Sequence, residues 1–153
     1  MSRVGNAPLI LMAEDDPEDV MFAQDALAEA KMLNPFVVVE DGQELMDYLR
    51  GTGSFAPPFE ASRPGIILMD LNMPRKDGKE ALAEIRSDPT LKDIPVIVLT
   101  TSKADSEILN TYSLGANSYI VKPVSFEGLV GVMRSIDNYW FEFVKLPVHP
   151  EFA

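Results

Sequence analysis

The sequence predicts an α/β fold, a doubly wound (βα)5 sandwich in which a five-stranded parallel sheet carries helices on both faces. Short apolar runs alternate with amphipathic stretches along the 153 residues, in the order that consecutive βα units produce. Two of the runs, GIILMD and PVIVLT, are almost wholly apolar, which is typical of central parallel strands covered on both faces. The length suits one compact domain with its own core.

Five short apolar runs are predicted as strands. They occupy residues 8–13, 36–40, 65–70, 95–100 and 117–121. In such sheets, ligands bind outside the carboxyl ends of the strands. The residues that follow the strands are therefore the candidates for a functional site.

Five helices are predicted where apolar residues recur at helical spacing. The first covers about residues 17–31, the third ends near Asp88-Pro89, and the fourth ends at Gly115. The apolar faces are marked by Val20, Ala23, Leu27 and Ala30; Leu45, Met46 and Leu49; Ala81, Leu82 and Ile85; Ile108, Leu109 and Tyr112; and Leu129, Val132, Met133, Ile136 and Trp140. Residues 51–65, rich in Pro and Gly, form the one long loop, which we interpret as a surface connection or, alternatively, as a partner contact.

Charge and composition narrow the possible functions. The formal net charge of −11 argues against a nucleic acid or an anionic membrane as partner and favours a basic protein surface or a bound cation. The absence of cysteine excludes disulfides, thiolate metal sites and thiol catalysis. There is no signal-peptide pattern, and no apolar run approaches the roughly 18 residues of a membrane span, so we expect a cytoplasmic protein.

Polar residues follow the predicted strands. Glu14 and Asp15 come after the first strand, Asp70 ends the third, Thr100 ends the fourth, and Lys122 comes after the fifth. Three carboxylates at one sheet edge would raise one another's pKa. A divalent hard cation removes this conflict, because carboxylate oxygens are ligands that magnesium prefers. We therefore predict a cation site at this edge.

The acids that follow Asp15 are interpreted as part of a helix start. Asp16 before Pro17 is typical of an N-cap followed by the first helical residue. Glu18 and Asp19 then lie in the first turn, where the helix dipole favours negative charge. For the two acids before them, capping and cation binding stay equally open on this reasoning.

Several residues have a structural interpretation when each is taken alone. Thr100 can be a strand residue satisfied by the backbone, Tyr119 can be half-buried packing, and Lys122 can be a solvated lysine before a turn. Asp77-Gly78 is typical of a turn and helix start. Core packing, rather than thioether metal binding, is expected of Met12, Met69 and Met73.

Four segments in combination resemble the receiver domain of two-component response regulators: ILMAEDD, ILMDLNMPRKDG, VIVLTTS and YIVKP. The resemblance extends over about residues 9–140, in one order with no missing element. It implies a flavodoxin-like sheet with strand order 2-1-3-4-5. It also implies a receiver domain at residues 1–140, followed by a tail at residues 141–153 and no output domain.

The resemblance implies a role for each residue at the strand ends. Asp70 would accept the phosphoryl group, because a carboxylate is a workable nucleophile that gives a mixed anhydride of limited lifetime. Mg²⁺ would be bound by Asp15, Asp70 and the backbone carbonyl of Asn72, with Glu14 acting through a coordinated water. The cation and Lys122 would neutralise charge that grows on the phosphoryl group.

The resemblance also implies a conformational switch. Thr100 would hydrogen-bond a phosphoryl oxygen and draw the following loop inward, so that Tyr119 swings from exposed to buried. The population of states would then shift across residues 105–119, in the fourth helix and fifth strand. The Lys122-Pro123 peptide bond would be cis and would turn the lysine into the site.

These implications describe a phosphoacceptor signalling domain and not an enzyme. It would take its phosphoryl group from a sensor histidine kinase of a phosphorelay, its own residues would catalyse the transfer, and it would lose the group by slow autodephosphorylation. Its output would be the response of an unknown downstream target protein. No nucleic-acid or membrane partner is expected.

The end of the chain carries the segment YWFEFVKLP, with apolar groups all round. This is more apolar surface than one buried helix face can use, so it needs a cover. We expect a homodimer built on the fifth helix and tail. The ending and the Pro-rich loop together resemble the single-domain regulators that partner bacterial phytochrome-type histidine kinases, which implies a role in light signalling.

Two other functions fit a similar sheet less well. A phosphatase with an aspartyl nucleophile typically has a second Asp two residues later, where this chain has Asn72. A flavodoxin-like electron carrier needs a hydroxyl- and glycine-rich phosphate loop after the first strand, where this chain has EDDPED. His149, the only histidine, lies in a Pro-flanked tail and is interpreted as a surface residue, so no histidine base is expected.

Overall fold

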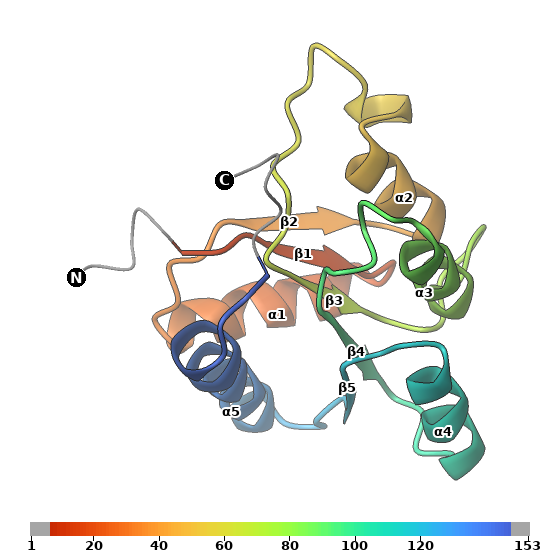
Figure 1. Ribbon diagram of the computed structural model, residues 1–153. Coiled ribbons are helices and arrows are strands. Elements are labelled where there is room, and N and C mark those ends of the chain that lie inside the picture. The colour runs from red at the N-terminus through yellow and green to blue at the C-terminus, as the bar shows by residue number, and fades with distance from the viewer. Residues whose placement is uncertain (1–6, 148–153) are drawn as a thin grey trace.

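The computed structural model describes residues 7–147, and its five parallel strands form one sheet in the order β2-β1-β3-β4-β5 (Figure 1). The strands are β1 (Ile10–Ala13), β2 (Phe36–Val39), β3 (Ile66–Met69), β4 (Val96–Thr100) and β5 (Ser118–Val121). Each strand lies within its predicted range. The predicted fold class and strand order are confirmed.

Five α-helices alternate with the strands. They are α1 (Pro17–Glu29), α2 (Gly42–Arg50), α3 (Gly78–Ser87), α4 (Asp105–Ser113) and α5 (Phe126–Ile136). The last continues directly into the π-helical segment η2 (Asp137–Phe143). Figure 1 shows α1 and α5 together on one face of the sheet, with α2 and α3 on the other.

Two apolar cores fill the space between the sheet and its helices, because successive strand residues point to opposite faces. Ile10 and Met12 of β1 pack with α1 and α5, whereas Leu11 and Ala13 pack with α2 and α3. Strands β1, β3 and β4 are buried along their whole length, as expected of strands covered on both faces. The core packing predicted for three methionines is confirmed, because each is less than one tenth exposed: Met12, Met69 and Met73.

Acidic residues begin three of the helices. Asp16 caps α1 and accepts the backbone N–H of Glu18 at 2.9 Å. Asp77 and Glu80 form a reciprocal capping box at the start of α3, and Asp41 caps α2. Each such cap is worth about 1 kcal/mol relative to alanine. Both predicted helix starts, at Asp16 and at Asp77, are confirmed.

Helix α4 does not bury the predicted face. Leu109 is 70% exposed and Tyr112 is 46% exposed, whereas Thr111 is fully buried and donates its hydroxyl to the carbonyl of Glu107 at 2.7 Å. The prediction from Leu109 and Tyr112 is therefore wrong. The physical reason is the place of α4 next to the edge strand β5, where little sheet surface is available to cover (Figure 1).

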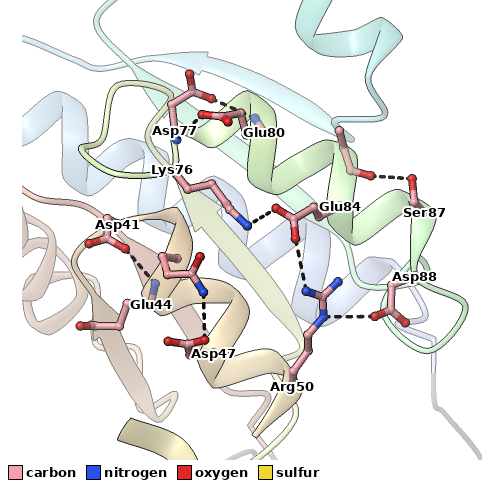
Figure 2. A network of polar contacts seen from close by, with 12 residues as sticks. Asp41, Glu44, Asp47, Arg50, Lys76, Asp77, Glu80, Glu84, Ser87 and Asp88 are labelled. Carbon is pink, nitrogen blue, oxygen red and sulfur yellow. Dashed lines mark hydrogen bonds and ion pairs between the residues drawn. The ribbon is translucent and has the colours of Figure 1, made fainter. Parts of the chain in front are cut away.

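A polar network between α2 and α3 holds the loop that joins β3 to α3 (Figure 2). Lys76 of this loop forms an ion pair with Glu84 of α3. Arg50 of α2 lies 3.2 Å from Glu84 and 3.5 Å from Asp88. Single exposed ion pairs are worth only about 0–1 kcal/mol, so the network acts mainly by fixing geometry.

The same loop is fastened to the start of α2. Arg75, whose backbone is left-handed with φ 62°, places its guanidinium 2.7 Å from the carboxylate of Asp41. The N–H of Gly42 donates to the carbonyl of Lys76 at 2.8 Å, and a Cβ at Gly42 would overlap that carbonyl. Burial acts to raise the pKa of Asp41, but the hydrogen bonds from Arg75 and from the backbone N–H of Glu44, together with the charge of Arg75, outweigh it and the pKa is lowered.

The segment after α5 is only partly covered. Trp140, Phe141 and Leu146 are half-buried against the core between the sheet, α1 and α5. Tyr139 is 58% exposed and Phe143 is 81% exposed. The tail therefore presents apolar surface that its own domain leaves open.

Among residues 7–147, no helix has both the length and the apolar character to cross a membrane. Residues 148–153, with the predicted surface residue His149, lie outside the described part of the chain.

Candidate functional site

Acidic side chains gather at the carboxyl ends of β1 and β3. Glu14 is 2% exposed, Asp70 is 8% exposed, and Asp15 is exposed. Each of the three offers a carboxylate oxygen, and these oxygens lie within 4.8 Å of one another. The predicted cluster of three carboxylates is therefore present in the fold.

The sheet register explains this placement. Ala13 of β1 pairs with Met69 of β3, and the N–H of Asp70 donates to the carbonyl of Ala13 at 3.1 Å. Glu14 and Asp70, the residues that directly follow these two strands, therefore lie side by side. At the other side, the N–H of Lys122 donates to the carbonyl of Thr100 at 2.7 Å, which brings β5 and its lysine to the same edge.

The ammonium of Lys122 lies among the carboxylates. Its Nζ is 2.7 Å from Oε1 of Glu14, 2.8 Å from Oδ2 of Asp19 and 3.3 Å from Oδ2 of Asp70. The lysine side chain is only 13% exposed. The alternative interpretation, a solvated lysine before a turn, does not hold, because the ion pairs take the place of water around the ammonium.

Asp19 is a site residue that sequence reasoning missed. It was interpreted only as an acid favoured by the helix dipole, and it does lie in the first turn of α1. Its carboxylate nevertheless turns towards Lys122. The spacing from the N-cap Asp16 could have revealed this role. Asp19 follows Asp16 by about one helical turn, so its side chain lies on the side of the helix that faces the strand end.

Electrostatics in the site favour a cation. Burial raises the pKa of Glu14 to about 7, against opposition from the Lys122 hydrogen bond and with a further rise from the charge of Asp70. Burial acts to lower the pKa of Lys122, but hydrogen bonds to Asp19 and Glu14 outweigh it and raise the pKa. When Glu14 is ionised, the four carboxylates of the site, Glu14, Asp15, Asp19 and Asp70, carry three more negative charges than the one ammonium can compensate.

The donor set fits a hard divalent ion. All three clustered ligands are carboxylate oxygens, which magnesium and manganese prefer over nitrogen and sulfur. Both oxygens of Glu14 already have protein donors, Lys122 at 2.7 Å and the backbone N–H of Asp16 at 3.1 Å. Asp70 also has a donor on each oxygen, but these are longer, Lys122 at 3.3 Å and the N–H of Asn72 at 3.5 Å, so its oxygens are less tightly held than those of Glu14.

The other predicted site residues lie around this cluster. Thr100 is fully buried at the end of β4, and its Oγ1 lies 3.5 Å from the N–H of Ser102. The N–H of Asn72 lies 3.5 Å from Oδ1 of Asp70. Tyr119 is half-buried in β5 and donates its hydroxyl to the carbonyl of Ser102 at 3.0 Å. Tyr119 is therefore connected to the loop that follows Thr100.

The prediction of a cis Lys122-Pro123 bond is wrong in this structure. Within the described residues, the cis peptide bond is Pro57-Pro58, so Pro123 follows a trans bond. The trans form is the intrinsically preferred state of an X-Pro bond. The ion pairs show that Lys122 reaches the carboxylates without the predicted cis turn.

Comparison with known proteins places this geometry in context. The sequence profile of the response regulator receiver domain matches residues 10–134. Response regulator Rcp1 of Synechocystis sp. is 37% identical over 148 residues, which cover 96% of this chain and 99% of Rcp1.

Solved structures agree with that match. The crystal structure of the phosphorylated cyanobacterial phytochrome response regulator RcpA is 44% identical with a TM-score of 0.84, over 93% of this chain and 99% of RcpA. The Mn²⁺-bound form of Rcp1 is 36% identical with a TM-score of 0.82, over 92% of this chain and 99% of that structure. These relatives share both the fold and nearly the whole length of the chain.

Proposed function

The chain belongs to the response regulator receiver domain family, and from this premise we propose that it is a stand-alone response regulator phosphorylated on Asp70. The observation that carries the proposal is the setting of the Asp70 carboxylate. It has an oxygen within 4.8 Å of the other two carboxylates of the cluster and lies 3.3 Å from the ammonium of Lys122, and Asp70 is 8% exposed. The 37% identity to response regulator Rcp1, over 96% of this chain and 99% of Rcp1, supports a response regulator.

The reaction is transfer of a phosphoryl group from a phosphohistidine of a sensor histidine kinase. An oxygen of Asp70 attacks phosphorus, and the bond from phosphorus to the imidazole nitrogen breaks. The histidine keeps the electron pair and takes a proton from solvent. Water later attacks phosphorus of the acyl phosphate, which releases inorganic phosphate and restores the carboxylate.

Lys122 and a divalent cation share the work of charge neutralisation. Lys122 lies 3.3 Å from Asp70 and has N–H donors for the phosphoryl oxygens. Asp15, Asp70 and the backbone carbonyl of Asn72 would hold Mg²⁺, with Glu14 acting through a water, in keeping with the two protein donors that Glu14 already has. When bound, the ion supplies positive charge next to the phosphoryl oxygens.

The output is a shift in conformational population around α4 and β5. Thr100 would bond a phosphoryl oxygen and draw the loop after β4 towards Asp70. The side chain of Tyr119 would move together with that loop, because its hydroxyl donates to the carbonyl of Ser102 at 3.0 Å. The exposed Tyr112, which accepts the N–H of Tyr119 at 3.0 Å, would then present a changed surface to a target protein. Asn72 and Ser102 would tune the phosphate lifetime by controlling water.

The proposed partner is a phytochrome-type histidine kinase. RcpA, 44% identical to this chain, is a phytochrome response regulator. In this proposal, residues 1–140 form a cytoplasmic receiver domain and residues 141–153 extend a homodimer interface that begins on α5. The exposure of Tyr139 and Phe143 supports that interface.

Phosphorylation of the purified protein tests the proposal. With Mg²⁺ and acetyl phosphate, intact-mass spectrometry should show the gain of one phosphoryl group. Asp70→Asn should abolish the gain, Lys122→Ala should strongly reduce it, and a chelator of divalent ions should prevent it. A wild-type protein that gains no mass, or an Asp70→Asn protein that still does, would contradict the proposed function.

A further inference from the structure

Lys122 has a carboxylate partner that lies outside the cluster of cation ligands. Its Nζ lies 2.8 Å from Asp19, practically as close as to Glu14 at 2.7 Å and closer than to Asp70 at 3.3 Å. We propose that Asp19 is a positioning residue, which holds the ammonium of Lys122 in place for phosphoryl transfer to Asp70. This inference rests on the proposed function of Asp70.

Helix α1 makes Asp19 a fixed anchor. Asp16 caps the helix, Pro17 opens it, and Asp19 is its third residue. The positive end of the helix dipole stabilises a carboxylate in this first turn. The side chain of Asp19 is 34% exposed and that of Glu14 is 1% exposed. The ammonium is thus held between a buried acid and an acid at the solvent side of the site.

A bound cation makes the contact with Asp19 more important. The clustered oxygens belong to Glu14, Asp15 and Asp70, and Asp19 is not among them. A divalent ion at the cluster would share the charge of Glu14 and Asp70 and would repel the ammonium of Lys122. Asp19 is then the anion that keeps Lys122 within reach of Asp70.

Asp19 has two properties, a hydrogen bond to Lys122 and a negative charge, and their effects on phosphorylation can be measured separately. Its hydrogen bond orients Lys122, which acts on the rate of transfer from a bound donor. Its negative charge opposes the approach of an anionic phosphodonor, which acts on the half-saturating donor concentration. Asparagine removes the charge and keeps an oxygen acceptor, whereas alanine removes both. Comparison of the two variants therefore isolates the positioning effect.

The test measures the initial rate of phosphorylation against acetyl phosphate concentration, at saturating Mg²⁺. Asp19→Asn and Asp19→Ala should share a lower half-saturating concentration than wild type. The maximal rate of Asp19→Ala should fall about tenfold below that of Asp19→Asn, less than the roughly hundredfold loss that a 1 Å misplacement can cause. Glu18→Gln, which removes an exposed acid from the same turn, should leave the maximal rate unchanged. Alanine favours helix, so the variant is expected to fold.

A second comparison shows whether Asp19 acts through Lys122. In a Lys122→Ala background, Asp19→Ala and Asp19→Asn should have equal maximal rates. Equal maximal rates with Lys122 present, or an unchanged ratio in the Lys122→Ala background, would overturn the positioning role. If wild type is phosphorylated, such results leave the function of Asp70 standing. A wild type that is not phosphorylated overturns both proposals.

Discussion

The Nζ of Lys122 lies 2.7 Å from Glu14 and 3.3 Å from Asp70, so the ammonium is closer to the more deeply buried of the two carboxylates. Of these two carboxylates, the lysine therefore compensates Glu14 more than Asp70. A cation at the cluster can take over that compensation. The lysine and the cation therefore compete for the same negative charge before a phosphoryl group arrives.

Removal of the lysine charge should strengthen cation binding. Lys122→Met keeps the aliphatic stem and removes the positive charge, so Mg²⁺ affinity near pH 8 should rise about tenfold at low ionic strength. Isothermal titration calorimetry measures the change. Lys103→Met, which removes an exposed lysine from the loop after β4, serves as the control and should change the affinity little. An unaltered or weaker affinity in Lys122→Met would refute the competition.

Stability without divalent ions should decrease as pH rises towards neutrality, through the contribution of Glu14. Burial raises its folded-state pKa to about 7, whereas the ordinary value is 4.5. Between these values the folded state binds more protons than the unfolded state, so this contribution is lost as pH rises. Glu14→Gln cannot ionise. From about pH 5 to pH 8, the free energy of unfolding of Glu14→Gln should therefore rise relative to that of wild type by about 2.5 kcal/mol.

Urea unfolding with a chelator present measures this difference. At the higher pH, saturating Mg²⁺ should reduce the difference in free energy of unfolding between Glu14→Gln and wild type, because a bound cation stabilises the ionised Glu14. A constant difference between the two proteins across the pH range would show that Glu14 titrates normally.

The close contact between Gly42 and the carbonyl of Lys76 should be essential to the conformation of the loop after Asp70. A Cβ at Gly42 would overlap the carbonyl of Lys76, whereas a Cβ at Gly131 of α5 would meet nothing within 4 Å. Gly42→Ala should therefore lower stability by about 1–3 kcal/mol and slow phosphorylation of Asp70, since the loop must shift. Gly131→Ala should instead stabilise the protein by about 0.5–1 kcal/mol. Thermal unfolding and the acetyl phosphate assay measure both, and equal effects of the two alanines would contradict the argument.

Dimerisation should depend on the apolar surface after α5. Deletion of residues 141–153, and separately Phe143→Ser, should halve the molar mass measured by light scattering, because Phe143 is 81% exposed. Leu109→Ser provides a matched control, since Leu109 is 70% exposed but lies on α4. A monomeric wild type, or dissociation caused by Leu109→Ser alone, would rule out the interface on α5 and the tail.

Local patterns in the sequence are enough to predict the sheet, the order of its elements and the acidic edge. Strands such as Val96–Thr100 and helix starts such as Asp16 and Asp77 depend on local patterns of apolar residues and capping side chains, which a chain shows directly. Because parallel strands align their carboxyl ends, the sequence predicts that Glu14 and Asp70 lie together. The roles of Asp70, Thr100 and Tyr119 are those that the resemblance to receiver domains implies.

The direction in which particular side chains turn follows from the packing of the elements and cannot be predicted from one segment alone. Asp19 satisfied a helix-dipole rule completely, yet the packing of α1 against the sheet brings it to Lys122. Leu109 fitted an apolar periodicity, yet α4 beside an edge strand leaves it exposed. Periodicity gives spacing along one element, whereas the direction of a side chain depends on what neighbouring elements cover. That information is in the packing of the helices on the sheet.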